Sequence, residues 1–286
     1  WINYTTLYHL IFIVKIKNNM RVCILGGGLS SLTLAKSLVN QKIYVDVLFS
    51  KKFYSENKTR TIGISKSNIE FFNEKIVNIE KIIYNLNQIE IYSDKLKKQK
   101  LINFGNNNNH LFSIVKNYKL QEILEKNLFK NNYFRKINNK KKVNYFKDYD
   151  LVFNTDYNHP ITKKYFSKKI EKKYNSIAYT TILKHDKISN NIAVQIFTAN
   201  GPLAFLPISD FETSVVYSIN SYLKDKKEIN KLINHYNYKY KLKKINKIDS
   251  FPLKGLSLRS YFHKNILAFG DLLHRIHPLA GQGFNM

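Results

Sequence analysis

The segment RVCILGGGLSSLTLAKSLVN, from Arg21 to Asn40, decides the fold. Its first five residues, RVCIL, form a short apolar run that predicts a buried strand. GGGLSS follows at once, and then LTLAKSLVN, whose apolar residues recur at helical spacing. A second strand-like run, IYVDVLFS from Ile43 to Ser50, completes a β-α-β unit within about 30 residues. The pattern therefore predicts an α/β sheet.

The glycine-rich turn between the first strand and the helix has the spacing of a dinucleotide-binding motif. Gly26 allows the tight turn, and Gly28 would let backbone N–H groups approach a pyrophosphate at the positive end of the helix. Ser31 stands at the third position of the G-x-G-x-x-G pattern and is small enough for close helix packing. The strand before and the helix and strand after supply the context that favours dinucleotide binding over a structural turn.

The acidic residue that usually contacts the ribose in such a unit is not at its expected place. The second strand ends near Ser50, whereas Asp46 lies inside that strand. Ser50, Asp46 and Glu56 all remain candidates for the contact.

The middle of the chain first continues the α/β pattern and then changes character. We expect a loop and a helix in TRTIGISKSNIEFF, a strand over Ile89–Asp94, a helix over Leu120–Leu128 and a strand over Leu151–Asp156. From Ser176 to Tyr222 successive β-rich segments follow one another without helical runs, which predicts an inserted antiparallel sheet. A Lys-rich helix is expected over 222–247.

A second glycine-containing motif, ILAFGDLLHRIHPLAGQGFN, closes the chain. Asp271 follows a strand-like run and is placed to accept a hydrogen bond from a sugar hydroxyl, while Gly281 and Gly283 allow backbone amides to approach a flat ring or an anion. A metal site at His274 and His277 is not expected, because Pro278 would end any helix there and no Cys or carboxylate cluster joins them.

The charge balance is strongly basic, with 47 Lys and Arg against 20 Asp and Glu and a net charge of +27. The excess is mostly Lys, spread along the chain beside the Asn, Ile and Tyr that AT-rich codons specify, and no nucleic-acid motif accompanies it. We interpret it as compositional and expect no nucleic-acid partner, while attraction to an acidic membrane surface stays open. The single cysteine, Cys23, excludes an intrachain disulfide and fits a cytoplasmic location.

Residues 1–19 stand apart from this pattern. The apolar run Leu7–Val14 is shorter than the roughly 20 residues that a membrane span needs, and Lys15 and Lys17 follow it where a signal peptide would place its charges before. Met20 directly precedes the first strand. We therefore expect 1–19 to be a leader or a disordered extension.

Five segments together resemble the FAD-dependent aromatic-ring monooxygenases, in the order of that family. They are GGGLSS, TRTIGIS from Thr59, IVKNYKLQEIL from Ile114, GPLAFLPISD from Gly201, and the final GD…HPLAGQGFN. GPLAFLP and the IV-x-N-x-x-LQ-x-x-L pattern are most similar to the ubiquinone-biosynthesis hydroxylase branch. The resemblance departs at Tyr157, where the family has glycine after aspartate, at Leu272 and Leu273, where it has small residues, and at Met286, where it continues; we therefore expect a C-terminally truncated member.

The resemblance implies an α/β fold: a Rossmann-like FAD-binding domain with an inserted antiparallel β-sheet substrate domain, like that of para-hydroxybenzoate hydroxylase. The expected division is 20–160 for the first part of the FAD-binding domain, 161–250 for the β-rich substrate domain and 251–286 for the return segment.

The resemblance also implies which residues bind FAD. Gly26 and Gly28 would meet the pyrophosphate, Arg60 and Gln121 would lie near the phosphate and ribityl region, and Asp271 would bind the ribityl chain. The segment Pro278–Asn285 would lie against the isoalloxazine ring. The complete expected cofactor-binding set is Gly26, Gly28, Ser31, Arg60, Gln121, Gly270, Asp271, Pro278, Gly281, Gln282, Gly283 and Asn285. No residue is singled out as catalytic, and no metal is expected.

The implied activity is hydroxylation of the aromatic ring of a polyprenylated phenol in ubiquinone biosynthesis, with FAD as cofactor and NAD(P)H and O₂ as co-substrates. The inserted sheet, Ser176–Tyr222, is the candidate wall of the substrate site. The alternatives are another FAD oxidoreductase of the same fold, such as a prenyl reductase or a different aromatic hydroxylase, and an inactive truncated remnant that binds flavin. We expect a cytoplasmic location, with peripheral association with the inner face of the membrane or with other ubiquinone-biosynthesis proteins.

Overall fold

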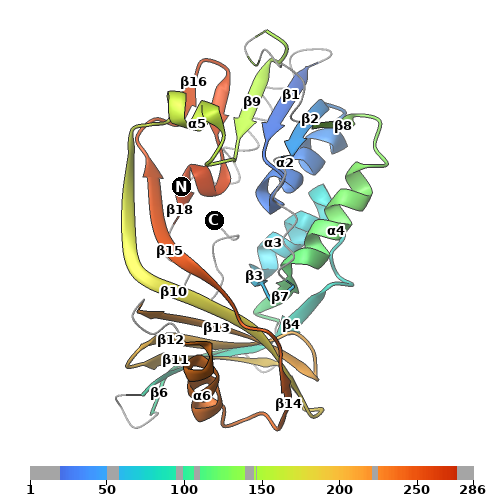
Figure 1. Ribbon diagram of the computed structural model, residues 1–286. Helices are drawn as coiled ribbons and strands as arrows, with labels where there is room; N and C mark the ends of the chain where they lie inside the picture. The colour runs from blue at the N-terminus through green and yellow to red at the C-terminus, as the bar shows by residue number, and fades with distance from the viewer. Residues whose placement is uncertain are drawn as a thin grey trace.

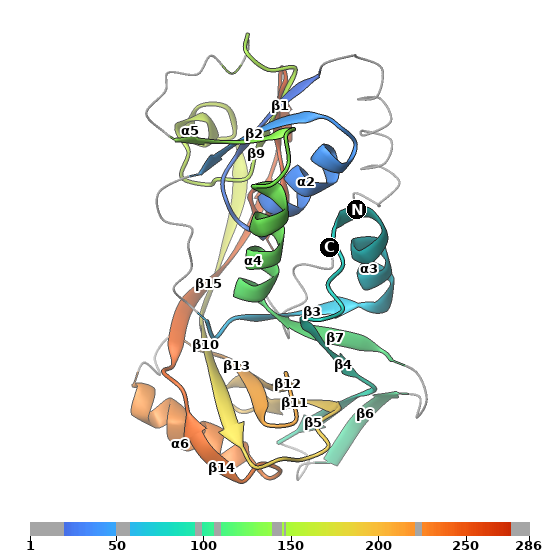
Figure 2. The same ribbon diagram turned by 90° about the vertical axis from the view of Figure 1, so that its right-hand side faces the viewer.

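The computed structural model describes residues 20–49, 58–94, 99–105, 110–138, 145, 147–220 and 225–275. An α/β part lies above a large β-sheet in Figure 1, and two long strands, β10 (Lys169–His185) and β15 (Asp249–Leu258), run from one to the other. Figure 2 shows the same two strands side by side from the perpendicular direction. The expected extension at 1–19 lies outside the described residues.

The predicted β-α-β unit is confirmed as β1 (Arg21–Leu25), α2 (Leu29–Asn40) and β2 (Tyr44–Phe49). β1 is central in a six-stranded sheet of order β16-β17-β9-β1-β2-β8, in which β17, β9, β1, β2 and β8 are parallel. The other strands are β8 (Phe134–Asn138), β9 (Leu151–Asn154), β16 (Phe262–His263) and β17 (Ile266–Ala268). A short helix, α5 (Pro160–Tyr165), follows β9. This is the expected Rossmann-like arrangement, and its parallel strands all end at one edge.

The helices over this sheet are held by apolar faces at helical spacing. In α2, Leu32, Ala35 and Leu38 are buried against the sheet. In α4 (Asn117–Leu128), every fourth residue from Leu120 to Leu128 is fully buried in the same core. The predicted helix over Leu120–Leu128 is thus confirmed, and burial of these leucines is the main term that stabilises it.

The predicted antiparallel strands after Ser176 are confirmed, and they belong to a larger sheet in which β5 pairs in parallel with β11. Nine strands take part, in the order β18-β15-β10-β13-β12-β11-β5-β6, with β14 pairing with β10. Besides β10 and β15, the strands of this sheet are β5 (Gln88–Ser93), β6 (Gln99–Gly105), β11 (Ile192–Thr198), β12 (Gly201–Pro207), β13 (Glu212–Asn220), β14 (Leu242–Ile245) and β18 (His274–Arg275). The sheet therefore also takes strands from 88–105 and from the end of the described chain. The domain limits at 160 and 250 stay predictions.

Two predicted elements differ from the structure. Thr61–Ser65, expected as a loop, is strand β3 of a three-stranded sheet with β7 (Phe112–Lys116) and β4 (Ile83–Leu86), because β7 supplies its hydrogen-bonding partners. α3 (Lys66–Phe71) and a π-helical turn, η1 (Phe72–Ile76), follow it.

The helix expected over 222–247 is shorter, since α6 spans Lys226–Tyr236 and the chain then pairs with β10 as β14. Asp225 caps the start of α6, and Ile229 and Ile233 pack under the large sheet, where Figure 1 shows the helix.

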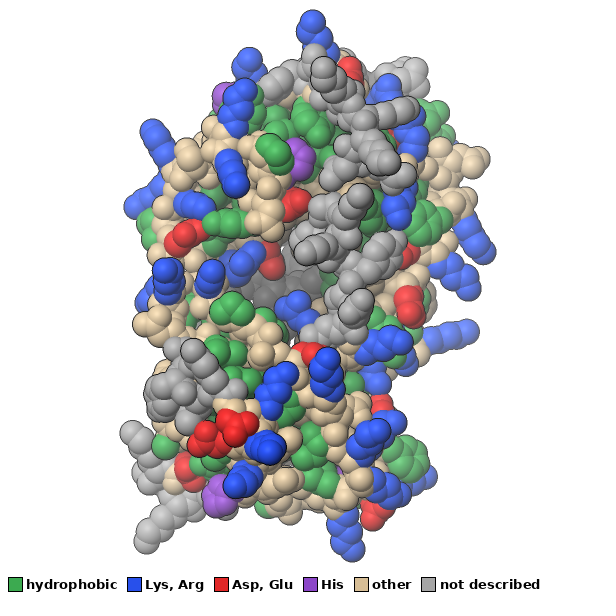
Figure 3. All heavy atoms as spheres, in the orientation of Figure 1, with side chains coloured by type: hydrophobic (Ala, Val, Ile, Leu, Met, Phe, Trp, Pro, Cys, Tyr) green, Lys and Arg blue, Asp and Glu red, His purple; other side chains and the backbone are tan. Residues whose placement is uncertain are grey.

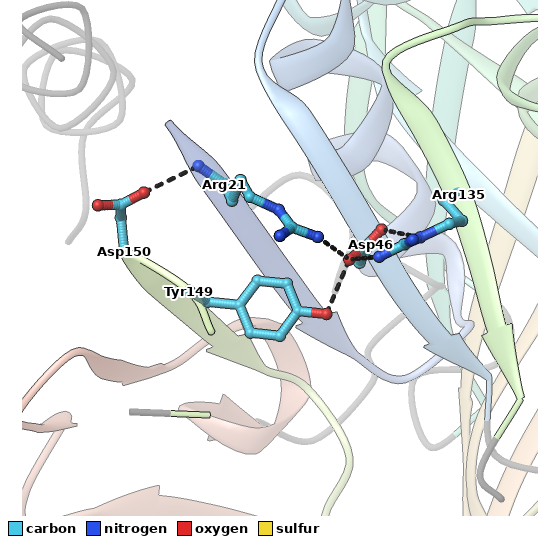
Figure 4. Close-up of polar contacts among 5 residues, drawn as sticks. All are labelled: Arg21, Asp46, Arg135, Tyr149 and Asp150. Carbon is cyan, nitrogen blue, oxygen red and sulfur yellow. Dashed lines mark hydrogen bonds and ion pairs between the residues drawn. The ribbon is translucent and has the colours of Figure 1, made fainter. Parts of the chain in front are cut away.

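A buried carboxylate joins three strands of the six-stranded sheet at their amino ends. Asp46 of β2 accepts two hydrogen bonds from Arg135 of β8, at 2.8 and 2.6 Å, and one from the Tyr149 hydroxyl at 2.7 Å, while Arg21 of β1 lies 3.5 Å away (Figure 4). Burial and the hydrogen bond to Asp46 raise the pKa of Tyr149, and Asp46 raises the pKa of Arg135. Both oxygens of Asp46 are thus engaged within the protein.

We predict that Asp46→Asn lowers the free energy of unfolding by about 2 to 3 kcal/mol, because it leaves the guanidinium groups without their counter-charge. Asp186→Asn is the matched control, since its carboxylate pairs with Lys243 at the exposed surface. Urea denaturation of both variants and the parent checks this. Equal stability of the two variants would show that the Asp46 cluster contributes nothing beyond a surface pair.

Candidate functional site

The carboxyl edge of the six-stranded sheet brings three chain turns together. The Gly26 amide donates to the Leu48 carbonyl at 3.0 Å, and the Thr155 amide donates to the Leu25 carbonyl at 2.9 Å. The Phe269 amide donates to the Asn154 carbonyl at 2.9 Å. The turns after β1, β9 and β17 are therefore neighbours, as the rule for open α/β sheets requires of a ligand site.

Two of the three glycines after β1 are needed by the protein itself. Gly26 has a φ of +121°, and an added Cβ would collide with Thr155 Oγ1. A Cβ on Gly27 would lie 2.6 Å from the Phe49 ring. Each glycine is thus explained by backbone conformation or by packing.

Gly28 has no such explanation within the protein. Its φ of −77° suits any residue, and an added Cβ would meet nothing within 4 Å. Gly28 directly precedes α2. Among the described residues, no side chain caps the start of α2, and the first turn of the helix contains no acidic residue. An open glycine at an uncapped helix start leaves N–H groups available to an anion.

Ser31 holds α2 close to the sheet. Its side chain is fully buried, and its hydroxyl lies 2.7 Å from that of Thr155. The hydroxyl of Thr155 in turn donates to the Leu25 carbonyl. The small side chain at Ser31 therefore allows the close packing that the sequence predicted, through an internal hydrogen bond.

The Gly270-Asp271 turn touches the start of the same helix. Gly270 opens a 3-10 turn, η2 (Gly270–Leu272), at a φ of +63°, and its added Cβ would lie 3.0 Å from Ser30 Cβ. Asp271 is exposed and comes next in the chain. Two motifs separated by more than 200 residues in sequence are therefore in contact, and Asp271 lies at the edge where α2 begins.

Arg60 reaches this edge from the other side. It precedes β3, and its guanidinium lies over the Phe251 ring of β15, 4.7 Å from the centroid. Burial lowers the pKa of Arg60, the Asp271 carboxylate opposes that shift, and Arg275 adds to it. Arg60 is nevertheless an exposed residue. Figure 3 shows the molecule hollowed between its upper and lower parts, with basic and acidic side chains along the rim.

Other candidate residues have different surroundings. The Gln121 amide donates to Glu125 of the same helix at 2.8 Å, so its contact with a cofactor stays a prediction. Asp46, one of the three candidates for the ribose contact, is occupied by Arg135 and Tyr149 and lies near the amino end of β2, so it is not suited to that role. Ser50 and Glu56 lie outside the described residues.

The end of the second motif is also outside the described residues. It contains Pro278, Gly281, Gln282, Gly283 and Asn285, as well as His277. Within the part that is described, no group of three or more His, Cys, Asp or Glu could hold a metal ion. Nor is any helix in the described segments long and apolar enough to cross a membrane.

Sequence reasoning missed Phe251 and Arg275 as neighbours of the site. Arg275 stands four residues after Asp271, but nothing in its spacing marks it, and Phe251 lies in a strand from the other sheet. The register of β15 against β10 places Phe251 beneath Arg60, and β18, which contains Arg275, pairs with the same strand at Leu256 and Ser257.

No family model matches the chain, but curated proteins and solved structures do. It is 30% identical to the mitochondrial ubiquinone biosynthesis monooxygenase COQ6 of Drosophila melanogaster, over 37% of this chain and 31% of that protein. It is 31% identical to the 3-demethoxyubiquinol 3-hydroxylase of Escherichia coli K12, over 32% of this chain and 25% of that protein. The chain thus matches about a third or less of the length of these relatives.

The similar solved structures cover nearly all of the chain. The probable FAD-dependent monooxygenase PqsL of Pseudomonas aeruginosa has a TM-score of 0.73 at 15% identity, over 94% of this chain and 82% of that one. The p-nitrophenol 4-monooxygenase PnpA of Pseudomonas putida DLL-E4 also has a TM-score of 0.73, at 11% identity, over 94% and 77%. The predicted resemblance to ubiquinone-biosynthesis monooxygenases is confirmed by the sequence matches, and the predicted fold is confirmed by the structures.

We predict that Ala substitution destabilises the protein at one glycine of the first turn and has little effect at another. Gly26→Ala should lower the free energy of unfolding by about 2 kcal/mol or more, because the left-handed φ and the contact with Thr155 both oppose a Cβ. Gly28→Ala should change it by less than about 0.5 kcal/mol, since the new methyl group meets no protein atom. Thermal and urea unfolding of the cofactor-free protein checks both. A large loss of stability in Gly28→Ala would mean that the turn is packed and not open.

Proposed function

We propose that the chain binds FAD at the carboxyl edge of its six-stranded sheet and serves in hydroxylation of the aromatic ring of a polyprenylated phenol in ubiquinone biosynthesis, with NAD(P)H and O₂. The observation that carries this proposal is the contact between the open Gly28 turn and the Asp271 turn, through Ser30 and Gly270. Helix N–H groups and a carboxylate at one edge fit the two chemically different parts of a single dinucleotide, its phosphates and its sugar hydroxyls.

The residues present fit FAD. The amides at Gly28 and the first turn of α2 would bind the diphosphate, and the Asp271 carboxylate would accept hydrogen bonds from the ribityl hydroxyls. Arg60, fixed over Phe251, would add positive charge beside them. Bound FAD would supply the redox and oxygen-transfer chemistry, and the chain would supply binding, orientation and exclusion of water.

The large sheet provides the surface beside which a substrate ring would lie. Ala178 pairs with both Ser218 and Phe251, so all three share one face of the sheet. Their neighbours in sequence, Ile177 and Tyr179, pack toward α6 on the opposite face. The face with Phe251 is therefore the one beneath Arg60, and the half-buried Phe251 ring offers an apolar surface beside which a substrate ring would lie.

The relatives support the substrate class by their printed names, which are a ubiquinone biosynthesis monooxygenase and a 3-demethoxyubiquinol 3-hydroxylase. Ubiquinone precursors carry a prenyl chain on a phenolic ring, which would lie against the Phe251 face of the large sheet. A cytoplasmic chain bound at the periphery of a membrane would meet such a substrate, and that location stays part of the proposal.

FAD binding is the first prediction of this function. The parent chain titrated with FAD should become yellow and quench flavin fluorescence. Gly28→Ala and Asp271→Asn should each weaken FAD binding about tenfold or more. The first would place a methyl group where the diphosphate approaches the helix, and the second would remove the charge of the group that accepts hydrogen bonds from the ribityl hydroxyls. Asp186→Asn loses the same charge at a remote exposed site and should bind as the parent does. Equal affinity in all four proteins would contradict the proposed site.

The reaction is tested by product analysis. The parent chain, supplied with FAD, NADH or NADPH, isotopically labelled O₂ and a prenylated phenol, should yield a ring-hydroxylated product that carries the label. A product with a saturated prenyl chain would instead identify a reductase of the same fold. FAD binding without any turnover of the phenol would identify a flavin-binding remnant, and either result would overturn the proposed hydroxylation.

A further inference from the structure

An open cavity of about 350 Å³ lies at the amino edge of the six-stranded sheet, where β1, β2 and β8 begin. Parallel strands begin and end at opposite edges, so this cavity is remote from the edge at which FAD is proposed to bind. Small-molecule sites occupy about 300 to 1,000 Å³, so there is room for a small ligand. The lining side chains with polar groups belong to Arg21, Tyr44, Asp46, Asn132, Tyr133 and Arg135.

Asp46 holds one guanidinium group in a fixed orientation in this lining. The Arg135 Nε and one of its two terminal nitrogens donate to the two oxygens of Asp46, at 2.8 and 2.6 Å (Figure 4). The other terminal nitrogen forms no hydrogen bond with a described residue, and the Arg135 side chain is 59% exposed. A guanidinium that is already held in place loses little further freedom when its remaining donors bind a ligand.

Arg21 approaches the same carboxylate from the other side, as Figure 4 shows. Its guanidinium lies 3.5 Å from Asp46 and 5.7 Å from the centroid of the Tyr149 ring, and its side chain is 51% exposed. Its other N–H groups have no partner among the described residues. Two guanidinium groups around one carboxylate leave this wall with one net positive charge and with free donors, which suits an anion.

The use of arginine here is selective. Only five of the 47 basic residues of the chain are Arg, and two of the five line this cavity. Lysine would supply charge, but the planar guanidinium binds a carboxylate or a phosphate through two parallel hydrogen bonds.

Two tyrosine rings form another part of the lining. The ring centroids of Tyr44 and Tyr133 are 4.9 Å apart, and Tyr44 is 46% exposed. Neither hydroxyl forms a hydrogen bond with a described residue. A single exposed aromatic residue is ordinary, but here an open ring and two guanidinium groups share one cavity. An open ring provides a surface on which a planar ligand stacks, and the hydroxyls provide donors and acceptors for its substituents.

We propose that this cavity binds a planar aromatic ring that carries an anionic group, a carboxylate or a phosphate. The anionic group accepts hydrogen bonds from Arg21 and Arg135, and the ring lies against Tyr44. Small aromatic acids and nucleoside monophosphates share this chemistry. The site is separate from the proposed FAD site, and the inference does not rest on the proposed function.

The test is binding of benzoate and of adenosine monophosphate to the full chain, by isothermal titration calorimetry at low salt with and without excess FAD. At least one of the two should bind with a dissociation constant of about 10 to 100 μM, whether or not FAD is present. The tighter ligand identifies the source, an aromatic acid or a mononucleotide. Benzyl alcohol and adenosine lack the charge and inorganic phosphate lacks the ring, so each should bind about tenfold more weakly or worse.

Two variants assign this binding to the cavity. Arg21→Gln removes one guanidinium and should weaken the affinity about tenfold, and Tyr44→Ser removes the stacking ring and should weaken it about fivefold. Arg259→Gln and Tyr261→Ser are the matched controls, because they remove the same exposed groups at other places and should bind as the parent does. Arg135 is left unchanged, since its loss would also unpair Asp46.

Four results would overturn the inference. They are no binding of either ligand at millimolar concentration, equal affinity for the charged ligand and its uncharged counterpart, equal weakening in Arg21→Gln and Arg259→Gln, and loss of all binding when FAD is added. The third would attribute the binding to overall charge, and the fourth would place it at the FAD site. Should Arg21→Gln fail to fold, parent-like affinity in Tyr44→Ser would by itself exclude the site.

Discussion

The close packing of the first turn of α2 against β9 and the Gly270 turn is the constraint on which the site depends. Gly26 adopts a left-handed φ beside Thr155, Ser31 shares a hydrogen bond with the same threonine, and Gly270 lies against Ser30. A side chain at Gly26 or Gly270 would push these segments apart. Because the three turns are in contact, the uncapped start of α2 and the Asp271 carboxylate lie at one edge of the sheet.

The two long strands β10 and β15 carry this constraint into the large sheet. β10 pairs with β15 along most of its length. The pairing begins with Lys169 opposite Leu258, at the end near the six-stranded sheet, and finishes with Thr180 opposite Asp249. β18 pairs with the upper end of β15, and Phe251 lies toward its lower end. Strand pairing thus leads from the segment after Asp271 to the strand whose Phe251 ring lies beneath Arg60 (Figure 1).

Asp46 and Asp271 show that residue type alone does not assign a role. Asp46 is buried and fully hydrogen-bonded, and it stabilises the sheet at the amino ends of its strands. Asp271 is exposed at the opposite edge and lacks such contacts among the described residues. This difference fits the rule that ligands of open α/β sheets bind outside the carboxyl ends of the strands, the edge where Asp271 lies.

The sequence alone determined the β-α-β unit, the α4 helix and the antiparallel strands after Ser176, and it singled out Gly26, Gly28 and Asp271 as candidate site residues. These follow from short-range patterns, because helix hydrogen bonds and tight turns join residues close in sequence. The tertiary structure decided that Thr61–Ser65 is a strand, that α6 ends at Tyr236, and that β5 and β6 join the large sheet. It also decided that Asp46 is internal and that Arg60 lies over the Phe251 ring. A strand's partners and a charge's neighbours are distant in sequence, and only folding brings them within hydrogen-bonding or electrostatic range.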